Sequence, residues 1–370
     1  MRKPAVRPPL SPLNHTKGNP VTSPKSVRRR WLGSVAAVAA SSLLITGCAS
    51  SSGGGSSSSS GSSGGSVEGK TVVFIPKSLG NKYFQASDKG GKTAVEEFKG
   101  KFQEVGPTEA SPTAQSSFIQ TATQQQAGAI VLAANDPNAV CADLKAAQQA
   151  GVKVVTFDSD TKCRDLFINQ VTVQGVADGL VDLMGKHLNG TGKVGIESGG
   201  PNATNLNAWV DAIKATMAKK YPNVQIVDVV YGNDVDADSY NAAKGLIQNH
   251  PDLNGIIAPD SVAVKEAGHF LSDSPQYQGK VWLTGLGLPS ELKDYVHSGV
   301  IEQFGLWNPE DLGFLAAYAA KALMAGDIKG KEGDKFEAGK LGSYTVGKDG
   351  EVVLGPLKVF DKSNVDQFSF

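Results

Sequence analysis

The segment TVVFIPKSLGNKYFQASDKGGKTAVEEF, residues 71–98, decides the fold class. It begins with a continuous β-branched and apolar run over 71–76 and continues as a helical pattern over 83–98. Apolar runs without alternation are typical of strands that are buried on both faces of a parallel sheet. The segment therefore predicts the first strand–helix unit of an α/β protein.

The same order of strand and helix repeats along the chain. Further apolar runs lie at 127–134 and 152–157, and each is followed by amphipathic residues. A second series starts with GKVGIES (192–198) and continues with apolar runs at 224–232, 254–260 and 280–287. Two such series, each of about 100 residues, predict two doubly wound parallel-sheet lobes.

The N-terminal 48 residues predict export and lipid attachment. Residues 1–30 carry eight Lys/Arg and no acid, and the uncharged run at 31–45 is too short, at about 1.5 Å per residue, to span ~30 Å of hydrocarbon. A basic region before a short apolar run is typical of an export signal. Ile45-Thr46-Gly47-Cys48 resembles the lipobox of bacterial lipoproteins, which implies cleavage after residue 47 and acylation of Cys48. An ordinary buried cysteine is the alternative, and the sequence leaves the Sec or Tat route open.

Residues 49–66 consist only of Ala, Ser and Gly. Such a segment behaves as a flexible coil with a reach of roughly 20–25 Å. We expect residues 48–67 to form a tether between a lipid on Cys48 and the folded body, so that the lipid is the only contact with the membrane. The expected location is the outer face of the cell membrane or the periplasm. A disordered interaction tail is the alternative, but it would not explain Cys48 at its head.

Net charge and cysteine content argue against nucleic-acid and metal binding and predict a disulfide. Without residues 1–47 the chain keeps 28 Lys/Arg against 36 Asp/Glu, a net charge of −8, which argues against nucleic-acid binding. Cys141 and Cys163 are then the remaining cysteines, and an isolated pair in an exported protein predicts one disulfide. Two free thiols are the alternative. No His or further Cys lies at ligand spacing beside either residue, so no metal site is expected.

Polar and turn residues follow most of the predicted strands. In open α/β sheets, ligands bind outside the carboxyl ends of the strands. Carboxylates and amides there can bond pairs of hydroxyls, while aromatic faces cover the apolar side of a sugar ring. These residues predict a polyhydroxylated ligand, although each alone could be a helix cap, a core residue or a surface charge. The strand-end segments are 76–84, 135–138, 158–160, 198–207, 258–261, 285–290 and 306–311.

Enzyme motifs are absent from the sequence. It contains no G-x-x-x-x-G-K-[ST] and, outside the Ser/Gly run, no G-x-S-x-G, and GLG at 285–287 lacks the third glycine of a dinucleotide site. Asp158 and Asp160 could act as paired carboxylates in hydrolysis, but strand-end acids more often cap helices or bind ligands. We therefore expect a binding protein without catalytic activity or cofactor.

Many strand-end segments together resemble one family. The chain is similar over about residues 70–370 to the substrate-binding proteins of bacterial sugar ABC importers, nearest to the rhamnose-binding proteins and their autoinducer-2-binding relatives. The resemblance implies a type I periplasmic-binding fold (periplasmic-binding-protein-like I) with two lobes, a three-segment hinge and a Cys141–Cys163 disulfide. The segments that carry it are FIPKSLGNKYF, GPTEAS, VVTFDSD, CRDLFINQ, NAWVDAIK, IIAPDS, FGLWNPEDLG and VLGPLKVFDKSNVDQFSF.

The resemblance also implies a division of the chain. Residues 68–170 and 284–306 are expected to form the N-terminal lobe, and residues 171–283 and 307–370 the C-terminal lobe. The crossing segments are expected near Asn169-Gln170, Thr284-Gly285 and Leu306-Trp307.

Comparison with the autoinducer-2 receptors makes the expected pocket more specific. Their pocket Lys, Asp and Pro match Lys77, Asp158 and Pro259. Their Asp-Gln pair falls on Asn205 and Leu206, and their Ala falls on Ser261. Loss of a carboxylate and an amide changes the hydrogen-bonding groups, so we expect a rhamnose-type ligand rather than autoinducer-2.

The resulting expectation is a lipoprotein that captures a small neutral sugar, L-rhamnose, and passes it to an ABC permease whose ATPase subunit supplies the energy. An autoinducer-2 receptor and a binder of another monosaccharide are the alternatives. Phe84 and Trp307 are expected to be apolar walls, and Leu206 to face the 6-methyl group of a deoxysugar. The protein is expected to act as a monomer.

Overall fold

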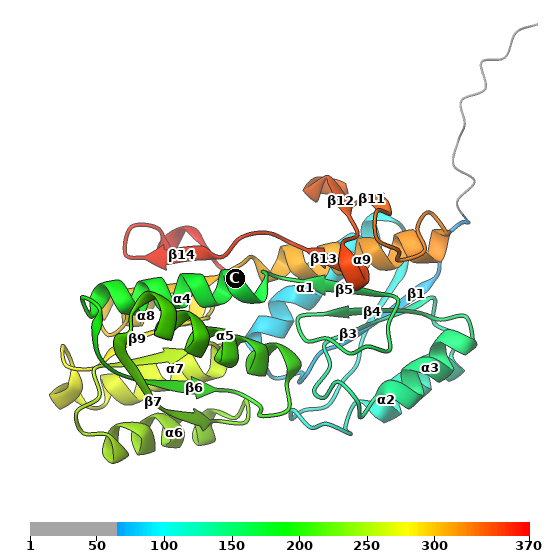
Figure 1. Ribbon diagram of the computed structural model, residues 1–370. Helices are drawn as coiled ribbons and strands as arrows, with labels where there is room; N and C mark the ends of the chain where they lie inside the picture. The colour runs from blue at the N-terminus through cyan, green and yellow to red at the C-terminus, as the bar shows by residue number, and fades with distance from the viewer. Residues whose placement is uncertain (1–64) are drawn as a thin grey trace, which may run out of the picture. The chain divides into compact units, whose positions relative to one another are not determined.

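The computed structural model describes residues 65–370. The expected signal peptide, Cys48 and most of the tether lie outside these residues. Two parallel sheets with covering helices account for most of the described chain, as Figure 1 shows.

The first lobe contains a six-stranded sheet in the order β13-β5-β4-β3-β1-β2, and every neighbouring pair is parallel. In β1, Val72 and Phe74 belong to one apolar cluster, and Val73 and Ile75 belong to another. Both faces of the strand are therefore buried, which explains the continuous apolar run in the sequence. The strands are β1 (Thr71–Ile75), β2 (Lys101–Glu104), β3 (Ala129–Leu132), β4 (Lys153–Phe157), β5 (Leu166–Asn169) and β13 (Glu351–Val353).

Helices cover both faces of this sheet. The helices α1 (Lys82–Glu97) and α9 (Pro309–Ala325) pack on each other and on one face. The helices α2 (Ser116–Gln124) and α3 (Cys141–Gln149) pack on the other face. The Asn81 side chain caps α1 by accepting from the Tyr83 backbone N–H at 2.8 Å, so the cap places Tyr83 at the carboxyl end of β1.

The second lobe contains a four-stranded parallel sheet in the order β7-β6-β8-β9. Two isolated parallel bridges, Leu283 to Ile301 and Leu286 to Gly305, link the segments around β9 and β10, and β10 pairs antiparallel with β14 in a separate two-stranded sheet. The strands of this lobe are β6 (Thr191–Ser198), β7 (Asn223–Tyr231), β8 (Gly255–Ala258), β9 (Trp282–Gly285), β10 (Gln303–Leu306) and β14 (Lys358–Asp361).

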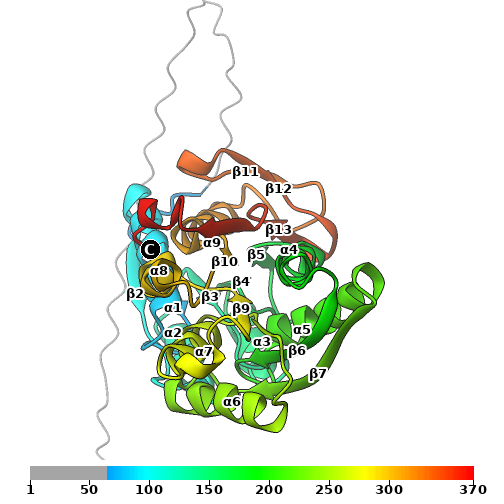
Figure 2. The ribbon, with the colours of Figure 1, turned by 90° about the vertical axis from the view of Figure 1, so that its left-hand side faces the viewer.

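Five helices belong to the second lobe, and they pack in pairs. Helix α4 packs on α5, and α6 packs on α7, which also contacts α8. The chain returns to α8 at its C-terminus (Figure 2), where the Phe370 carbonyl accepts from the Ser290 backbone N–H at 3.1 Å. The helices are α4 (Val173–His187), α5 (Thr204–Lys220), α6 (Asp236–Asn249), α7 (Ser261–Ser272) and α8 (Pro289–Ser298).

Short elements complete the described chain. The strands β11 (Lys335–Glu337) and β12 (Ser343–Thr345) form an antiparallel hairpin after α9. The 3-10 turns are η1 (Pro275–Tyr277), η2 (Gly339–Leu341), η3 (Lys348–Gly350) and η4 (Val365–Gln367). None of the helices between residues 65 and 370 is both long enough and apolar enough to cross a membrane.

Strand pairing corrects the predicted division of the chain between the lobes. Residues 284–306 are expected from the sequence in the N-terminal lobe, but β9 pairs with β8, and isolated bridges link the β10 segment to the β9 segment. Within the segment 307–370, which is expected in the C-terminal lobe, α9 packs on the first sheet and β13 pairs with β5. The error has a physical reason, because the local apolar pattern of a buried strand does not determine which sheet it joins.

The chain crosses between the lobes at three places: after β5, after β10 and between β13 and β14. The first two coincide with the crossings expected at Asn169-Gln170 and Leu306-Trp307. The crossing expected at Thr284-Gly285 is wrong, because β9 ends there within the second sheet. The third crossing lies at 354–357 instead, where the Leu354 N–H donates to the Asn169 carbonyl at 2.8 Å and so joins two crossing segments.

Glycines allow α1 and α9 to approach each other closely. A Cβ atom on Gly313 would lie well inside contact distance of the Ser87 carbonyl oxygen, which is backbone and cannot rotate away. We expect Gly313→Ala to destabilise the protein by about 1–3 kcal/mol through overpacking. Thermal unfolding followed by circular dichroism measures this as a lower melting temperature.

The matched control is Gly245→Ala in the middle of α6, where an added Cβ meets nothing within 4 Å. That change should leave stability unaltered or raise it by about 0.5–1 kcal/mol, because alanine favours helix. Equal melting temperatures for the two variants would contradict the close packing of α1 on α9.

Candidate functional site

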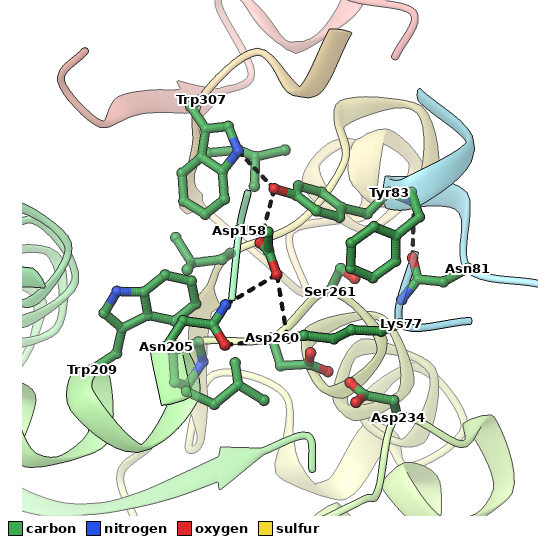
Figure 3. A pocket seen from close by; sticks show the side chains of 15 residues that line it. Lys77, Asn81, Tyr83, Asp158, Asn205, Trp209, Asp234, Asp260, Ser261 and Trp307 are labelled. Carbon is green, nitrogen blue, oxygen red and sulfur yellow. Dashed lines mark hydrogen bonds and ion pairs between the residues drawn. The ribbon is translucent and has the colours of Figure 1, made fainter. Parts of the chain in front are cut away.

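A cavity lies between the two lobes, at the carboxyl ends of strands from both sheets. The empty space among its lining side chains is about 370 Å³, a figure that includes space open to solvent. Figure 3 shows its side chains pointing toward one another from both lobes. The lining residues are Lys77, Asn81, Tyr83, Phe84, Asp158, Asn205, Leu206, Trp209, Asp234, Pro259, Asp260, Ser261, Leu286, Leu306 and Trp307.

All eight residues expected from the sequence to contact ligand line this one cavity. They come from strand ends in both lobes and are far apart in the sequence. Their roles toward a ligand remain predictions. The eight are Lys77, Phe84, Asp158, Asn205, Leu206, Pro259, Ser261 and Trp307.

Lys77, Asp158 and Asn205 form a closed triangle of polar contacts across the two lobes. The Lys77 ammonium lies 3.2 Å from Asp158 Oδ2 and donates to Asn205 Oδ1 at 3.1 Å. Asn205 Nδ2 donates to Asp158 Oδ2 at 3.2 Å. All three residues are buried, at 5%, 4% and 9% exposed, so water competes little with these contacts. We call them the cross-lobe triad.

Aromatic groups fix the other carboxylate oxygen of Asp158. The Tyr83 hydroxyl donates to Asp158 Oδ1 at 3.0 Å, and Trp307 Nε1 donates to the Tyr83 oxygen at 3.0 Å. Burial and the neighbouring carboxylate of Asp158 raise the pKa of Tyr83 well above its ordinary value. The phenol therefore keeps its proton and serves as a donor. The rings of Tyr83 and Trp307 meet edge to face at 90°, which holds Trp307 as a rigid wall.

The loop that carries Asp158 has an unusual backbone. Asp158 has φ +59°, in the left-handed region that Asp and Asn tolerate better than most residues. Nearby, Arg164 forms a 3.0 Å ion pair with Asp160, and Thr161 Oγ1 donates to the Pro137 carbonyl at 2.6 Å. The structure contains a disulfide between Cys141 and Cys163, which ties this loop to the start of α3.

Several lining residues are missing from the sequence-based prediction. Asn81, Tyr83 and Asp260 lie in strand-end segments that the sequence marked, but they were not selected. Trp209 follows Asn205 by four residues on α5, so helical spacing could have placed it on the same face. Asp234 lies in the loop after β7, which was not among the marked strand ends. Leu286 and Leu306 complete the lining set.

Polar chemistry in the cavity suits binding rather than proton transfer. Asp158 is held in place by contacts with Lys77, Asn205 and Tyr83. None of the four histidines between residues 65 and 370 lines the cavity, and each lies within 4 Å of an acidic side chain elsewhere. Within the described chain no group of three or more His, Cys, Asp or Glu could hold a metal ion.

Glu197 is a buried acid of the second lobe. It is the second-last residue of β6, is 0% exposed, and neither of its carboxyl oxygens has a hydrogen-bond partner in the structure. Burial, and then the charges of Asp260 and Glu266, raise its pKa well above the ordinary value. The folded state therefore keeps a proton that the unfolded chain releases above about pH 4.3.

Stability should consequently fall as pH rises from about 4.3 toward the raised pKa of Glu197, because the folded state binds the extra proton. Glu197→Gln cannot titrate, so we expect its advantage over the wild type to grow with pH in that interval. Urea unfolding at a series of pH values measures the difference. The control Glu96→Gln removes an exposed acid, 62% exposed, and should change stability by less than about 1 kcal/mol at each pH. Parallel curves for wild type and Glu197→Gln would contradict a protonated Glu197.

The two α/β lobes are joined by three crossing segments, and buried polar groups from both lobes meet in the cavity between them. This arrangement is typical of a hinged solute-binding protein. The chain matches the periplasmic binding protein domain over residues 72–328, which is more than half its length. The protein therefore belongs to the periplasmic binding protein family, and the predicted type I fold is confirmed.

Solved structures of similar proteins are sugar-binding components of ABC transporters. A sugar ABC transporter protein from Actinomyces odontolyticus is 45% identical over 81% of this chain and 98% of its own, with a TM-score of 0.67. A solute-binding protein from Clostridium phytofermentas with bound L-rhamnose is 34% identical over 82% and 99%, with a TM-score of 0.79. LsrB from Clostridium saccharobutylicum in complex with AI-2 is 28% identical over 81% and 100%, with a TM-score of 0.77.

The chain covers less than two thirds of the length of the curated relatives that it matches. It covers 65% of the D-ribose/D-allose-binding protein of Pseudomonas aeruginosa, at 26% identity over 53% of this chain. These relatives are solute-binding transport proteins rather than enzymes.

Proposed function

We propose that this protein is the extracytoplasmic sugar-binding component of an ABC importer and that its ligand is a small neutral sugar, L-rhamnose. The observation that carries the proposal is the cross-lobe triad, in which one carboxylate, one ammonium and one amide from two lobes converge in one cavity. These groups offer donors and acceptors for hydroxyls, and their burial gives each hydrogen bond more weight than in water.

The apolar part of the cavity supports a deoxysugar. Leu206, Leu286 and Leu306 line it together with the rings of Trp209 and Trp307. A methyl group packed there loses contact with water, a gain of about 0.8 kcal/mol for one carbon. A hydroxymethyl group in the same position would bury a hydroxyl without a partner, at a cost of about 1–3 kcal/mol. This difference favours a 6-deoxy sugar over its 6-hydroxy counterpart.

Binding couples to hinge motion in this proposal. A ligand that contacts Lys77 and Asp158 on one lobe and Asn205 on the other stabilises the closed arrangement in proportion to those contacts. The closed form then docks on a membrane permease, whose ATPase subunit supplies the energy for import. The lipid on Cys48 keeps the protein, as a monomer, at the outer face of the membrane.

Titration calorimetry of the body from residue 65 onward tests the proposal. L-rhamnose should bind with a Kd in the micromolar range or below, a binding free energy of about −8 kcal/mol or stronger, and should be recovered unchanged. Other aldoses, L-mannose among them as the 6-hydroxy counterpart, should bind more weakly. Heats of binding that are absent for every monosaccharide, or a sugar that is chemically altered, would refute it.

The autoinducer-2 receptor is the second candidate, because Lys77, Asp158 and Pro259 match the pocket residues expected of those receptors. Leu206→Gln separates the two. If Leu206 faces a sugar methyl group, the variant should lose affinity for L-rhamnose by about tenfold while adding an amide for a more polar ligand. Unchanged rhamnose affinity in the variant would remove the role proposed for Leu206.

A further inference from the structure

A second space lies between the two lobes, beside the cavity described above. Its walls come from the segments after β2 and β3 of the first lobe and from the segments before α5 and after β7 of the second lobe. The empty space among its lining side chains is about 560 Å³, a figure that includes space open to solvent. We call this space the outer chamber, and its polar lining consists of Ser111, Asn135, Asn202, Asn233 and Asp234.

The outer chamber and the cavity meet at Asp234, which lines both of them (Figure 3). On the first lobe, Asn135 Nδ2 donates to the Lys77 carbonyl at 3.0 Å, so the wall of the outer chamber is bonded to the residue that carries the triad ammonium. On the second lobe, Ala203 lines the outer chamber, and Asn205, two residues later, lines the cavity. A ligand held by the cross-lobe triad therefore has the outer chamber beside it.

Asn135 presents a fixed acceptor to the outer chamber. It is 6% exposed, and its backbone N–H donates to Gln115 Oε1 at 2.9 Å. Gln115 is itself held, because its side-chain amide donates to the carbonyls of Pro76 and Ala133 at 3.0 and 2.7 Å. Between residues 65 and 370 no group donates to Asn135 Oδ1. A buried amide oxygen that is held in place and lacks a protein donor suits a ligand hydroxyl.

The chemistry of the outer chamber favours a neutral, polyhydroxylated group. Amides, one hydroxyl and one carboxylate form its polar lining, and these groups exchange hydrogen bonds with hydroxyls. No lysine or arginine is among the described residues that line it, so a phosphate or carboxylate would find no cationic partner. The same lining residues include no aromatic ring on which a nucleobase could stack.

The two lobes touch each other at the edge of the outer chamber. Thr204 Oγ1 on the second lobe donates to the Asp160 carbonyl on the first lobe at 3.1 Å. Thr204 directly follows Ala203, which lines the chamber. The lobe arrangement that forms the cross-lobe triad thus also brings the walls of the outer chamber together. A ligand that fills both spaces gains contacts with both lobes and stabilises this arrangement further.

We infer that the outer chamber is a binding site for a second sugar ring, so that the protein captures a neutral disaccharide containing L-rhamnose. The inference rests on the proposed sugar-binding function and extends it from one ring to two. One ring occupies the cavity and bonds the cross-lobe triad, and the glycosidic link passes Asp234. The second ring lies in the outer chamber, where one of its hydroxyls donates to Asn135 Oδ1.

Calorimetry with L-rhamnose and with disaccharides of two L-rhamnose units, joined through each available hydroxyl in turn, tests the inference. At least one disaccharide should bind with a Kd no more than about tenfold above that of L-rhamnose, since contacts in the outer chamber offset the cost of ordering the second ring. L-rhamnose should displace that disaccharide competitively, because one ring of the disaccharide occupies the same cavity.

The outcomes separate this inference from the proposed function. If L-rhamnose binds but every disaccharide binds at least about 100-fold more weakly, the second ring has no site, and the inference is overturned while the proposed function stands. Simultaneous binding of L-rhamnose and a disaccharide would also overturn it. A disaccharide that binds where L-rhamnose does not would support the outer chamber and refute the single sugar as ligand. Absence of binding by L-rhamnose and by all the disaccharides would refute both.

Asn202→Trp tests the location of the second ring. Asn202 is exposed in the segment before α5, and a large ring there fills part of the outer chamber. The ratio of the disaccharide Kd to the L-rhamnose Kd should rise at least about tenfold, and L-rhamnose binding by the same variant reports that it is folded. The matched control is Asn249→Trp at the exposed end of α6, which lines neither space and should keep the wild-type ratio. A wild-type ratio in Asn202→Trp would contradict a second ring in the outer chamber.

Discussion

Asp158→Ala should raise the Kd for L-rhamnose about 100-fold or more. The carboxylate accepts from Lys77 and Asn205 through one oxygen and from Tyr83 through the other. Its removal deletes a charged acceptor for the ligand and leaves the Lys77 ammonium buried without its partner. Hydrogen bonds to charged groups contribute about 1.5–3 kcal/mol each, and loss of one or two of them accounts for this factor.

The same change should lower stability by about 3–5 kcal/mol, because it leaves an uncompensated buried charge. Calorimetry gives the affinity and thermal unfolding gives the stability. Asp158→Asn keeps a residue that accepts the left-handed backbone, so it tests the charge without disturbing the loop. Asp211→Ala, in an exposed position, should leave both quantities unchanged. Wild-type affinity in Asp158→Asn would show that the carboxylate does not contact the ligand.

Replacing both Cys141 and Cys163 with Ser should destabilise the protein by about 3 kcal/mol. The disulfide closes a loop with a sequence separation of 22 residues, and the chain-entropy model gives about this value for such a loop. Because the loop contains Asp158, we also expect weaker L-rhamnose binding, by about tenfold. Thermal unfolding should show a melting temperature lower by roughly 6–12 °C.

Wild-type protein treated with a reducing agent is the control for the double variant. If the covalent link is the cause, the reduced wild type should reproduce both the lower melting temperature and the weaker binding. A double variant that melts and binds as the oxidised wild type does would show that Thr161 and Arg164 alone hold the Asp158 loop.

The sequence predicted the fold class well because buried parallel strands have a strong local signature. β1, β3 and β4 each appear as a continuous apolar run, since both of their faces are covered. The choice of sheet for β9 and β10 could not be predicted in the same way. It depends on partners distant in sequence, and the short strand β13 lacks a pattern that would have marked the third crossing.

The candidate site was predictable to the extent that strand ends mark it. Lys77, Asp158 and Pro259 lie within two residues of the ends of β1, β4 and β8, so topology alone brings them together. Asp234 was missed because its place in the cavity lining depends on the shape of the loop after β7. No periodicity in the sequence encodes that shape.

The third crossing has a consequence for how the chain acquires its structure during synthesis. Helix α9 and β13, which complete the first lobe, are translated after nearly all of the second lobe, and β14 of the second lobe is translated later still. Neither lobe is contiguous, so neither can finish folding until the last few dozen residues have emerged. A nascent chain of this design stays incompletely packed until release, a state compatible with passage through a narrow secretion channel.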